Sequence, residues 1–301
     1  MPGLLIVIGG ATATGKTALA IRLAQHLQTE IISADSRQFY REMSIGTAKP
    51  TPEELAAVTH HFVNSLSVAD DYSVGDFEKD ALRVLEGIFQ RSPYAVLVGG
   101  SGLFLRAVCE GLDHFPDVSE AVRMEVEALW QKEGLEGLQQ TLLRLDPLHY
   151  ARIDQQNPAR LRRAVEVCLQ SGQAYSSFLN QGGRARPFAV VGLLLDLPRP
   201  LLYARIDARV GDMIAQGLEA EARALLPWRH RPALRTVGYE EFFDYFDGLT
   251  TREAAIEKIR QHSRNYAKRQ ATWFRKYGDW QTVPPEISAE AVLQLPGFTG
   301  R

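Results

Sequence analysis

The sequence predicts an α/β fold in which helices flank a parallel sheet and an all-helical insertion interrupts the chain. Apolar runs of the kind found in strands buried on both faces occur at residues 4–8, 94–98 and 188–195. Glycines follow the first two runs, and segments with helical spacing of apolar residues lie between them. From about Asp113 to Ala185, in contrast, helical patterns occur without any strand.

The first elements follow one another as strand, helix and strand. The strand at 4–8 ends at two glycines and leads into an amphipathic helix over 17–27. Residues 31–32 form a short second strand, and a strongly amphipathic helix covers 77–89. The third strand, 94–98, ends in a Gly-Gly-Ser-Gly tetrapeptide. This alternation is typical of parallel βαβ units.

The middle of the chain has a different character. Helical patterns separated by Pro and Gly occur there at 119–132, 135–145 and 158–170. We therefore expect a core of residues 1–112 and 187–301, interrupted by a helical insertion domain over 113–186. Apart from the strand-like run at 188–195, everything from Pro200 onward is expected to be helical.

Length and composition exclude several classes of protein. The chain has 301 residues, enough for about two domains, and it is 45% hydrophobic and 23% charged, as globular proteins are. Its apolar runs are much shorter than the ~20 residues of a membrane span, and no basic residue precedes the first one, so we expect neither membrane insertion nor a signal peptide. Two cysteines are too few for a disulfide scaffold or a thiolate zinc site, so we expect a protein of the reducing cytoplasm.

A phosphate-binding motif follows the first strand. The sequence Gly-Ala-Thr-Ala-Thr-Gly-Lys-Thr matches G-x-x-x-x-G-K-[ST] in full and stands between a strand and a helix. Backbone N–H groups of such a loop converge on a phosphate, and the helix N-terminus and the lysine add positive charge. The threonine hydroxyl is a ligand for Mg²⁺. The expected phosphate-binding residues are Gly10, Ala11, Thr12, Ala13, Thr14, Gly15, Lys16 and Thr17, and Thr17 is the expected metal ligand.

The acid that P-loop kinases and ATPases commonly place at a strand end is missing. The third strand ends at Gly99, Gly100 and Ser101, without a carboxylate. The nearest candidate is Asp35, just after the second strand. Because the carboxyl ends of parallel strands meet at one edge, Asp35 could act there as a base or beside Mg²⁺. The alternative is an aspartate that caps a turn with Ser36.

The charge is distributed unevenly. The net charge is −2, yet the stretch from 258 to 278 contains no acidic residue. Its basic residues are Lys258, Arg260, Arg264, Lys268, Arg269, Arg275 and Lys276. Tyr266, Trp273 and Phe274 lie among them, where they could stack on bases or pack. Such a stretch suits nucleic acid or an exposed helix face equally well. His60 and His61 lie side by side without a third ligand, and we interpret them as structural.

Ordered motifs over the whole chain resemble those of bacterial tRNA dimethylallyltransferases. The matching segments are Asp-Ser-Arg-Gln-Phe-Tyr at 35–40, Ile-Gly-Thr-Ala-Lys-Pro at 45–50, Gly-Gly-Ser-Gly at 99–102, Asn-Pro-Ala-Arg-Leu-Arg-Arg-Ala at 157–164, Arg-Thr-Val-Gly-Tyr at 235–239 and Lys-Arg-Gln-Ala-Thr-Trp-Phe-Arg at 268–275. Ala11 stands where the family often has Pro, and Ser101 where Thr is common. Both replacements preserve the local chemistry. The zinc finger of eukaryotic members is absent.

The resemblance implies a P-loop NTPase-like core and a prenyl transfer. The family moves a dimethylallyl group from dimethylallyl diphosphate to N6 of adenosine 37, next to the tRNA anticodon, giving N6-isopentenyladenosine and diphosphate. The leaving group is the whole diphosphate, so no acid for γ-phosphoryl transfer is needed. Lys16, Thr17 with Mg²⁺, and Arg209 would stabilise it, Asp35 would be the general base, and Ser101 would lie where the two substrates meet. Without the resemblance, Arg209 would be read as part of an exposed helix face.

The resemblance also implies a tRNA surface. The residues expected to contact tRNA are Asp35, Ser36, Arg37, Gln38, Ser101, Arg123, Ala159, Arg160, Leu161, Arg162, Arg163, Arg235, Thr236, Val237, Gly238, Tyr239, Lys268, Arg269 and Arg275. Contacts to phosphates would position the anticodon stem-loop, and the unstacked loop bases would give sequence preference. We expect a monomer.

Two other classes of protein remain as alternatives. In a P-loop kinase of a nucleotide or small metabolite, Lys16 and Thr17 would keep their roles and Asp35 would deprotonate a hydroxyl. The missing strand-end acid and the basic, aromatic stretch near the C-terminus count against it. A nucleic-acid-binding module switched by a nucleotide would need an acid linked to hydrolysis and a switch region. We find neither in the sequence.

Overall fold

The computed structural model describes residues 3–179 and 185–298. The chain forms two compact units, Met1–Glu110 together with Arg186–Arg301, and Gly111–Ala185. The first unit is an α/β core and the second is helical.

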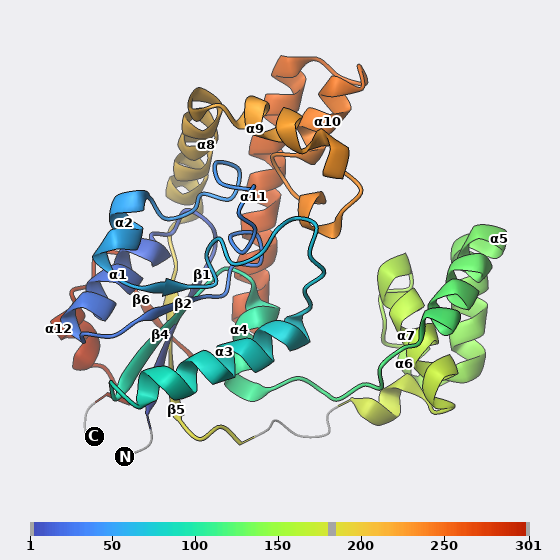
Figure 1. Ribbon diagram of the computed structural model, residues 1–301, viewed down its shortest axis with the longest axis horizontal. Helices are drawn as coiled ribbons and strands as arrows, with labels where there is room; N and C mark the ends of the chain where they lie inside the picture. Colours follow the sequence, from blue (N-terminus) through green and yellow to red (C-terminus); the bar gives the residue numbers. More distant parts are fainter. Residues whose placement is uncertain (1–2, 180–184, 299–301) are drawn as a thin grey trace. The chain divides into compact units, whose positions relative to one another are not determined.

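The core contains a six-stranded parallel sheet in the order β3-β2-β4-β1-β5-β6 (Figure 1). Its strands are β1 (Leu4–Gly10), β2 (Ile31–Ser33), β3 (His60–His61), β4 (Tyr94–Val98), β5 (Ala189–Leu195) and β6 (Trp280–Val283). β1 lies between β4 and β5, and all seven of its residues are buried. Neither face of such a strand contacts solvent, which explains why the sequence of β1 is continuously apolar. The predicted fold class is confirmed.

Strand β6 corrects the expectation that only helices follow Pro200. Its four residues, Trp-Gln-Thr-Val, pair in parallel with residues Gly192 to Leu195 of β5. Aromatic and β-branched residues favour strands, but four residues are too few for a periodic pattern to stand out. The strand is fixed by its pairing with β5, which lies about ninety residues earlier in the chain.

Helices cover both faces of the sheet. Those of the core are α1 (Lys16–His26), α2 (Pro52–Ala57), α3 (Val74–Phe89), α4 (Gly102–Glu110), α8 (Arg199–Gln216), α9 (Leu218–Leu225), α10 (Glu240–Phe246), α11 (Arg252–Lys276) and α12 (Ala289–Leu293), with 3₁₀ turns η2 (Leu226–Trp228) and η3 (Pro232–Leu234). On one face, Leu23 of α1 and Val292 of α12 pack against Ile6. On the other face lie α3, α4 and α11 (Figure 1). They pack through residues such as Phe77 and Phe274.

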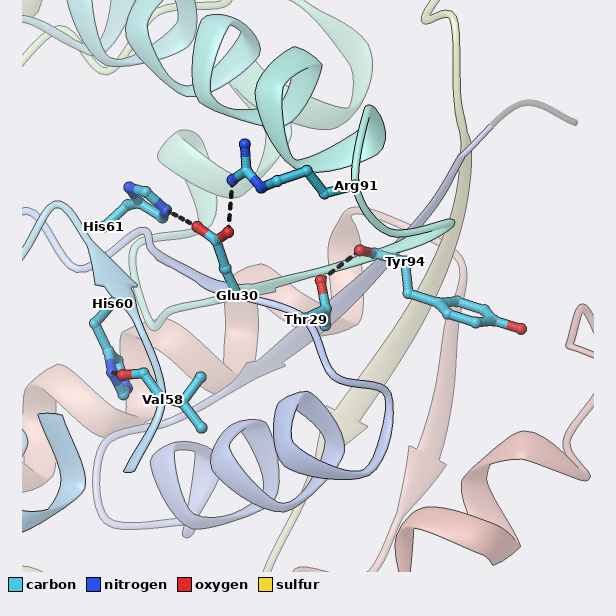
Figure 2. A network of polar contacts seen from close by, with 7 residues as sticks. All are labelled: Thr29, Glu30, Val58, His60, His61, Arg91 and Tyr94. Atoms are coloured by element: carbon cyan, nitrogen blue, oxygen red, sulfur yellow. Dashed lines mark hydrogen bonds and ion pairs between the residues drawn. The ribbon is translucent and has the colours of Figure 1, made fainter. Parts of the chain in front are cut away.

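A polar network holds the edge strand β3. Glu30, just before β2, accepts hydrogen bonds from Arg91 and from Nε2 of His61, both at 2.6 Å (Figure 2). The Nδ1 atom of His60 lies 2.8 Å from the carbonyl oxygen of Val58. The two histidines therefore contact different partners at the sheet edge, as adjacent residues of a strand do. Within the described residues, no group of three or more His, Cys, Asp or Glu side chains is arranged to hold a metal ion.

The second unit is built from α5 (Glu120–Leu145), α6 (Pro147–Tyr150), α7 (Pro158–Ser171) and the 3₁₀ turn η1 (Tyr175–Phe178). The two helices expected at 119–132 and 135–145 form one element, α5, with a break at Gly134, whose φ is 63°. Only glycine adopts this conformation readily, which explains why the helix bends there. Leu138 of α5 and Leu161 of α7 meet in the core of this unit.

Two further expectations from the sequence concern membrane insertion and the state of the two cysteines. In the described parts of the chain, no helix has the length and apolar composition that crossing a bilayer requires. Cys109 in α4 and Cys168 in α7 are both free thiols.

Candidate active site

The phosphate-binding motif forms a tight loop between β1 and α1. Gly10 has φ 149° and Gly15 has φ 96°, values that favour glycine. A Cβ atom on Gly10 would lie 2.7 Å from the carbonyl oxygen of Leu195, so this position has no room for a side chain. The buried hydroxyl of Thr14 donates to the carbonyl of Ala11 at 2.8 Å. The loop thus presents the N-terminus of α1, with its unpaired N–H groups, at the end of the sheet.

Lys16 is the first residue of α1 and points back across the loop. Its Nζ donates to the carbonyl oxygen of Ala11 at 2.7 Å. Burial lowers the pKa of Lys16 to about 8, an effect that the charge of Asp35 opposes and that of Arg209 reinforces. An ammonium group with so little water around it interacts strongly with any anion that enters.

Asp35 follows β2, at the same edge of the sheet. Its Oδ1 accepts a hydrogen bond from the backbone N–H of Arg37 at 3.1 Å. Burial raises the pKa of Asp35, although that hydrogen bond and the positive charge of Lys16 lower it. Asp35 makes a local turn contact, as the alternative interpretation expected, but with Arg37 and not Ser36, and its side chain also lines the cavity described next.

A cavity of about 170 Å³ brings the main sequence-predicted residues together. Its lining includes Thr12, Lys16, Thr17, Asp35, Arg37, Gln38, Arg209, Thr236, Val237 and Gly238. These residues come from the loop after β1 and the start of α1, from the segment after β2, from the middle of α8 and from the turn before α10. The parallel sheet thus explains why residues some 200 positions apart share one cavity.

Arg209 reaches this cavity from α8. Its neighbours Ile206 and Val210 are buried, and its Nη1 donates to the hydroxyl of Thr12 at 3.3 Å. Burial lowers the pKa of Arg209, against the effect of Asp212 and Asp35. Arg209 therefore faces the cavity and is not part of an open helix face.

Tyr266 lies close to Asp35, whereas Ser101 does not line the cavity and contacts Ser36, the residue after Asp35. The hydroxyls of Ser101 and Ser36 are 3.4 Å apart. Tyr266, on α11, lines the cavity, and burial together with the charge of Asp35 raises its pKa to about 12, while a hydrogen bond from Ser101 opposes the shift. The sequence left open whether Tyr266 stacks on a base or packs. Its position beside Asp35 depends on the direction of α11, which no local motif indicates.

The residues of the motif at 235–239 lie in two different surroundings, one beside Arg37 and one buried in the core. Arg37 donates to the carbonyl oxygens of Pro232 and Arg235, which ties this turn to the segment after β2. Tyr239, in contrast, is fully buried, and its hydroxyl donates to Glu221 at 2.7 Å. Glu221 also accepts the backbone N–H groups of the segment 44–46. Any contact between Tyr239 and a ligand would have to use its backbone.

The basic stretch divides into paired and exposed residues. Arg264 contacts Asp207 of α8 at 2.6 Å, and Arg260 contacts Glu257 at 3.2 Å. Farther along α11, the cations are exposed to solvent: Lys268, Arg269, Arg275 and Lys276. The exposed half of the stretch includes the three α11 residues expected to contact tRNA.

The expected tRNA residues of the helical unit also differ in their surroundings. Exposed positions are Arg123, Ala159, Arg160 and Arg163. Arg162 lies over the ring of Trp130 at 4.6 Å and contacts Glu127 at 2.8 Å. The side chain of Leu161 is completely buried. These two residues hold α7 against α5, so their side chains are occupied within the unit.

The fold and the cavity define a P-loop protein in which a phosphate-binding loop, an arginine and a carboxylate face one another. A profile of the family described as IPP transferase matches residues 38–277, and the chain belongs to that family. This membership confirms the resemblance noted in the sequence motifs.

Several curated relatives are similar over nearly their whole length. The chain is 51% identical over 276 residues to a tRNA dimethylallyltransferase of Christiangramia forsetii, covering 92% of this chain and 91% of the relative. It is 45% identical over 291 residues to tRNA dimethylallyltransferase 2 of Porphyromonas gingivalis, covering 97% of both. The chain is therefore assigned to the transferases.

Solved structures agree. The full-length tRNA isopentenylpyrophosphate transferase of Bacillus halodurans is similar with a TM-score of 0.69 and 36% identity, over 94% of this chain and 90% of that one. A eukaryotic dimethylallyltransferase acting on tRNA gives a TM-score of 0.78 and 25% identity, over 90% of this chain and 70% of that one. The P-loop-like fold is common to this chain and its neighbours.

Proposed function

We propose that this protein transfers the dimethylallyl group of dimethylallyl diphosphate to N6 of adenosine 37 in tRNA. The observation that carries the proposal is one cavity lined by Lys16, Arg209 and Asp35. Two cations and a phosphate-binding loop suit a diphosphate, and a neighbouring carboxylate suits an amine that must lose a proton. The names of the relatives add the dimethylallyl group and tRNA, which fit this chemistry.

The diphosphate leaves as the bond between its oxygen and C1 of the dimethylallyl group breaks. Negative charge then grows on the leaving oxygens. Lys16, Arg209 and the N–H groups at the start of α1 are oriented in advance to stabilise that charge in a poorly solvated cavity, where electrostatic interactions are strong. The incoming anion favours the protonated form of Lys16 and so opposes its lowered pKa.

We propose that a divalent cation, Mg²⁺, binds beside Thr17. Thr17 lines the cavity, and the described residues offer no cluster of carboxylates or imidazoles as an alternative cage. Mg²⁺ commonly binds through one or two protein oxygens, substrate phosphates and water. When bound, it would add positive charge next to the diphosphate oxygens.

Asp35 is proposed as the general base. The exocyclic amine of adenine is a poor nucleophile because its lone pair is delocalised into the ring. Asp35 would accept a hydrogen bond from this amine, and would take its proton as N6 forms the new bond to C1. Burial raises the pKa of Asp35 and so makes its carboxylate a stronger proton acceptor.

The tRNA is proposed to bind through exposed cations and through the cavity rim. Lys268, Arg269 and Arg275 of α11 would contact phosphates, as would Arg123, Arg160 and Arg163 of the helical unit. Arg37, Gln38 and the turn at 236–238 would surround the target base, which must leave its stack at a cost of a few kcal/mol. We further propose that the enzyme works as a monomer in the cytoplasm.

The deciding experiment is a paired assay of the purified protein with Mg²⁺. One reaction contains labelled dimethylallyl diphosphate and unmodified tRNA, and the other contains ATP with a panel of nucleotides and metabolites. We expect label in the tRNA and no ATP turnover. Phosphoryl transfer from ATP with unlabelled tRNA would instead establish the kinase alternative.

A further inference from the structure

A buried glutamine of α11 connects two segments of the cavity. Gln270 is 7% exposed and lines the cavity. Its Oε1 accepts a hydrogen bond from the backbone N–H of Thr12 at 2.9 Å, and its Nε2 donates to the carbonyl oxygen of Gly100 at 3.0 Å. Both functions of one amide are therefore used, each on the backbone of a different segment.

The two segments belong to opposite sides of the proposed reaction. Thr12 lies in the diphosphate-binding loop, and Arg209 holds its hydroxyl. Gly100 immediately precedes Ser101, which lies within 3.4 Å of Ser36 beside the proposed base. The amide of Gln270 thus joins the loop that would hold the donor to the strand end that would face the acceptor.

The fit around this amide is close. A Cβ atom on Gly100 would lie 2.3 Å from Nε2 of Gln270, so only a bare backbone admits the side chain. The helix that carries it is fixed by Ala267 and Phe274, which are buried, and by Trp273, which packs against Gly102. The amide therefore projects from a rigid support.

We propose that Gln270 is a positioning residue that sets the spacing between the diphosphate loop and the end of β4. It touches no reacting atom and acts through Thr12 and Gly100. The inference rests on the proposed function, since its purpose is to bring C1 of the donor and N6 of the acceptor into line. A misplacement of about 1 Å is enough to slow a reaction about a hundredfold.

Two substitutions separate positioning from simple packing. Gln270→Leu keeps the approximate volume but leaves the N–H of Thr12 and the carbonyl of Gly100 without a partner. Gln270→Glu keeps the shape and the acceptor, but the ionised carboxylate cannot donate to Gly100. Once protonated, the same carboxyl regains a donor. Lys16, Asp35, Arg209 and Tyr266 face the same cavity and titrate or carry charge there, so each variant is compared with the unsubstituted enzyme at every pH.

The test measures kcat, both KM values and the melting temperature of each variant. For Gln270→Leu, and for Gln270→Glu at pH 8, we expect kcat about a hundredfold lower and each KM within about threefold. For Gln270→Glu, kcat relative to the unsubstituted enzyme should recover as the pH falls. Gln281→Leu is the control, because Gln281 is a half-buried amide that donates to the carbonyl oxygen of Pro296 and does not line the cavity.

The possible results distinguish the two proposals. An unchanged kcat, a rise in KM alone, or the absence of recovery at low pH would overturn the positioning role of Gln270. If Gln270→Leu does not fold, the pH series of Gln270→Glu decides. Failure of the unsubstituted enzyme to prenylate tRNA in the same assay would reject the proposed function instead.

Discussion

Lys16 and Lys268 carry the same ammonium group in opposite surroundings. Lys16 lies in the cavity, and burial lowers its pKa to about 8. Lys268 lies on the exposed face of α11. The cavity thus gathers poorly solvated charges of both signs, whereas the helix surface carries cations in water.

The contrast indicates how each region works. A charge with little water around it interacts strongly over short distances and is screened little by salt. An exposed charge contributes little singly and is screened at physiological salt, but several together give affinity for a polyanion. We therefore expect large, salt-insensitive effects from the cavity and small, salt-dependent effects from the surface.

The largest effect is expected for Lys16→Ala. Loss of the ammonium group should abolish measurable binding of dimethylallyl diphosphate, because Lys16 is the cation that belongs to the phosphate loop itself. Calorimetry with the diphosphate alone checks this without tRNA. Lys268→Ala is the matched control and should bind the diphosphate normally. Undiminished affinity in Lys16→Ala would remove the P-loop from the donor site.

The second largest effect is expected for Asp35→Asn. The amide has nearly the same shape but cannot take the proton of the amine, so we expect turnover to fall by about two to four powers of ten. The affinity for tRNA, measured by filter binding, should be nearly unchanged. Equal losses of affinity and rate would make Asp35 a binding residue and not a base.

The pH dependence tests the same group. Burial raises the pKa of Asp35 above its ordinary value of 3.8, and only the ionised form can act as a base. Activity should therefore fall as the pH falls through that raised pKa. The acidic limb of the pH–activity profile should lie at a higher pH than the titration of an exposed carboxylate. The limb should be missing from the residual activity of Asp35→Asn. A limb that persists unchanged in that variant would assign the titration to another group.

On the surface, the double substitution of Lys268 and Arg269 by Ala should weaken tRNA binding moderately. The slope of log K against log salt should become shallower by about one to two, since each phosphate contact contributes a little under one. Arg264→Ala is the matched control because Asp207 already neutralises that residue. If Arg264→Ala changes the slope as much as the double variant, the tRNA surface extends farther along α11 than proposed.

The smallest effect separates two neighbours on α7. Arg160 is exposed, whereas Arg162 is occupied by Glu127 and Trp130. Arg160→Ala should lower tRNA affinity slightly and leave the melting temperature unchanged. Arg162→Ala should mainly lower the melting temperature, since it removes packing between α5 and α7. The reverse result would place the contact surface on the other side of the helix.

Much of the core followed from local sequence. The strand before the phosphate loop and the loop with Lys16 and Thr17 are visible because each depends on residues within a few positions of one another. The parallel sheet was predicted from the alternation of strands and helices along the chain. Asp35 could be placed at the same edge because parallel strands end together. Arg209 needed the family resemblance, since an arginine on an amphipathic helix carries no local signal of its partner.

The remaining features depend on long-range packing, which local patterns cannot represent. β6 forms because it pairs with β5. Arg264 is neutralised because α8 packs near it and places Asp207 at ion-pair distance. Gln270 meets Thr12 across 258 residues of sequence and Gly100 across 170. The sequence alone determined the chemistry of the phosphate loop and the family of the protein. Only the tertiary structure decided which charges are buried, which are paired and which amide joins the two sides of the cavity, because burial and pairing arise when distant segments exclude water together.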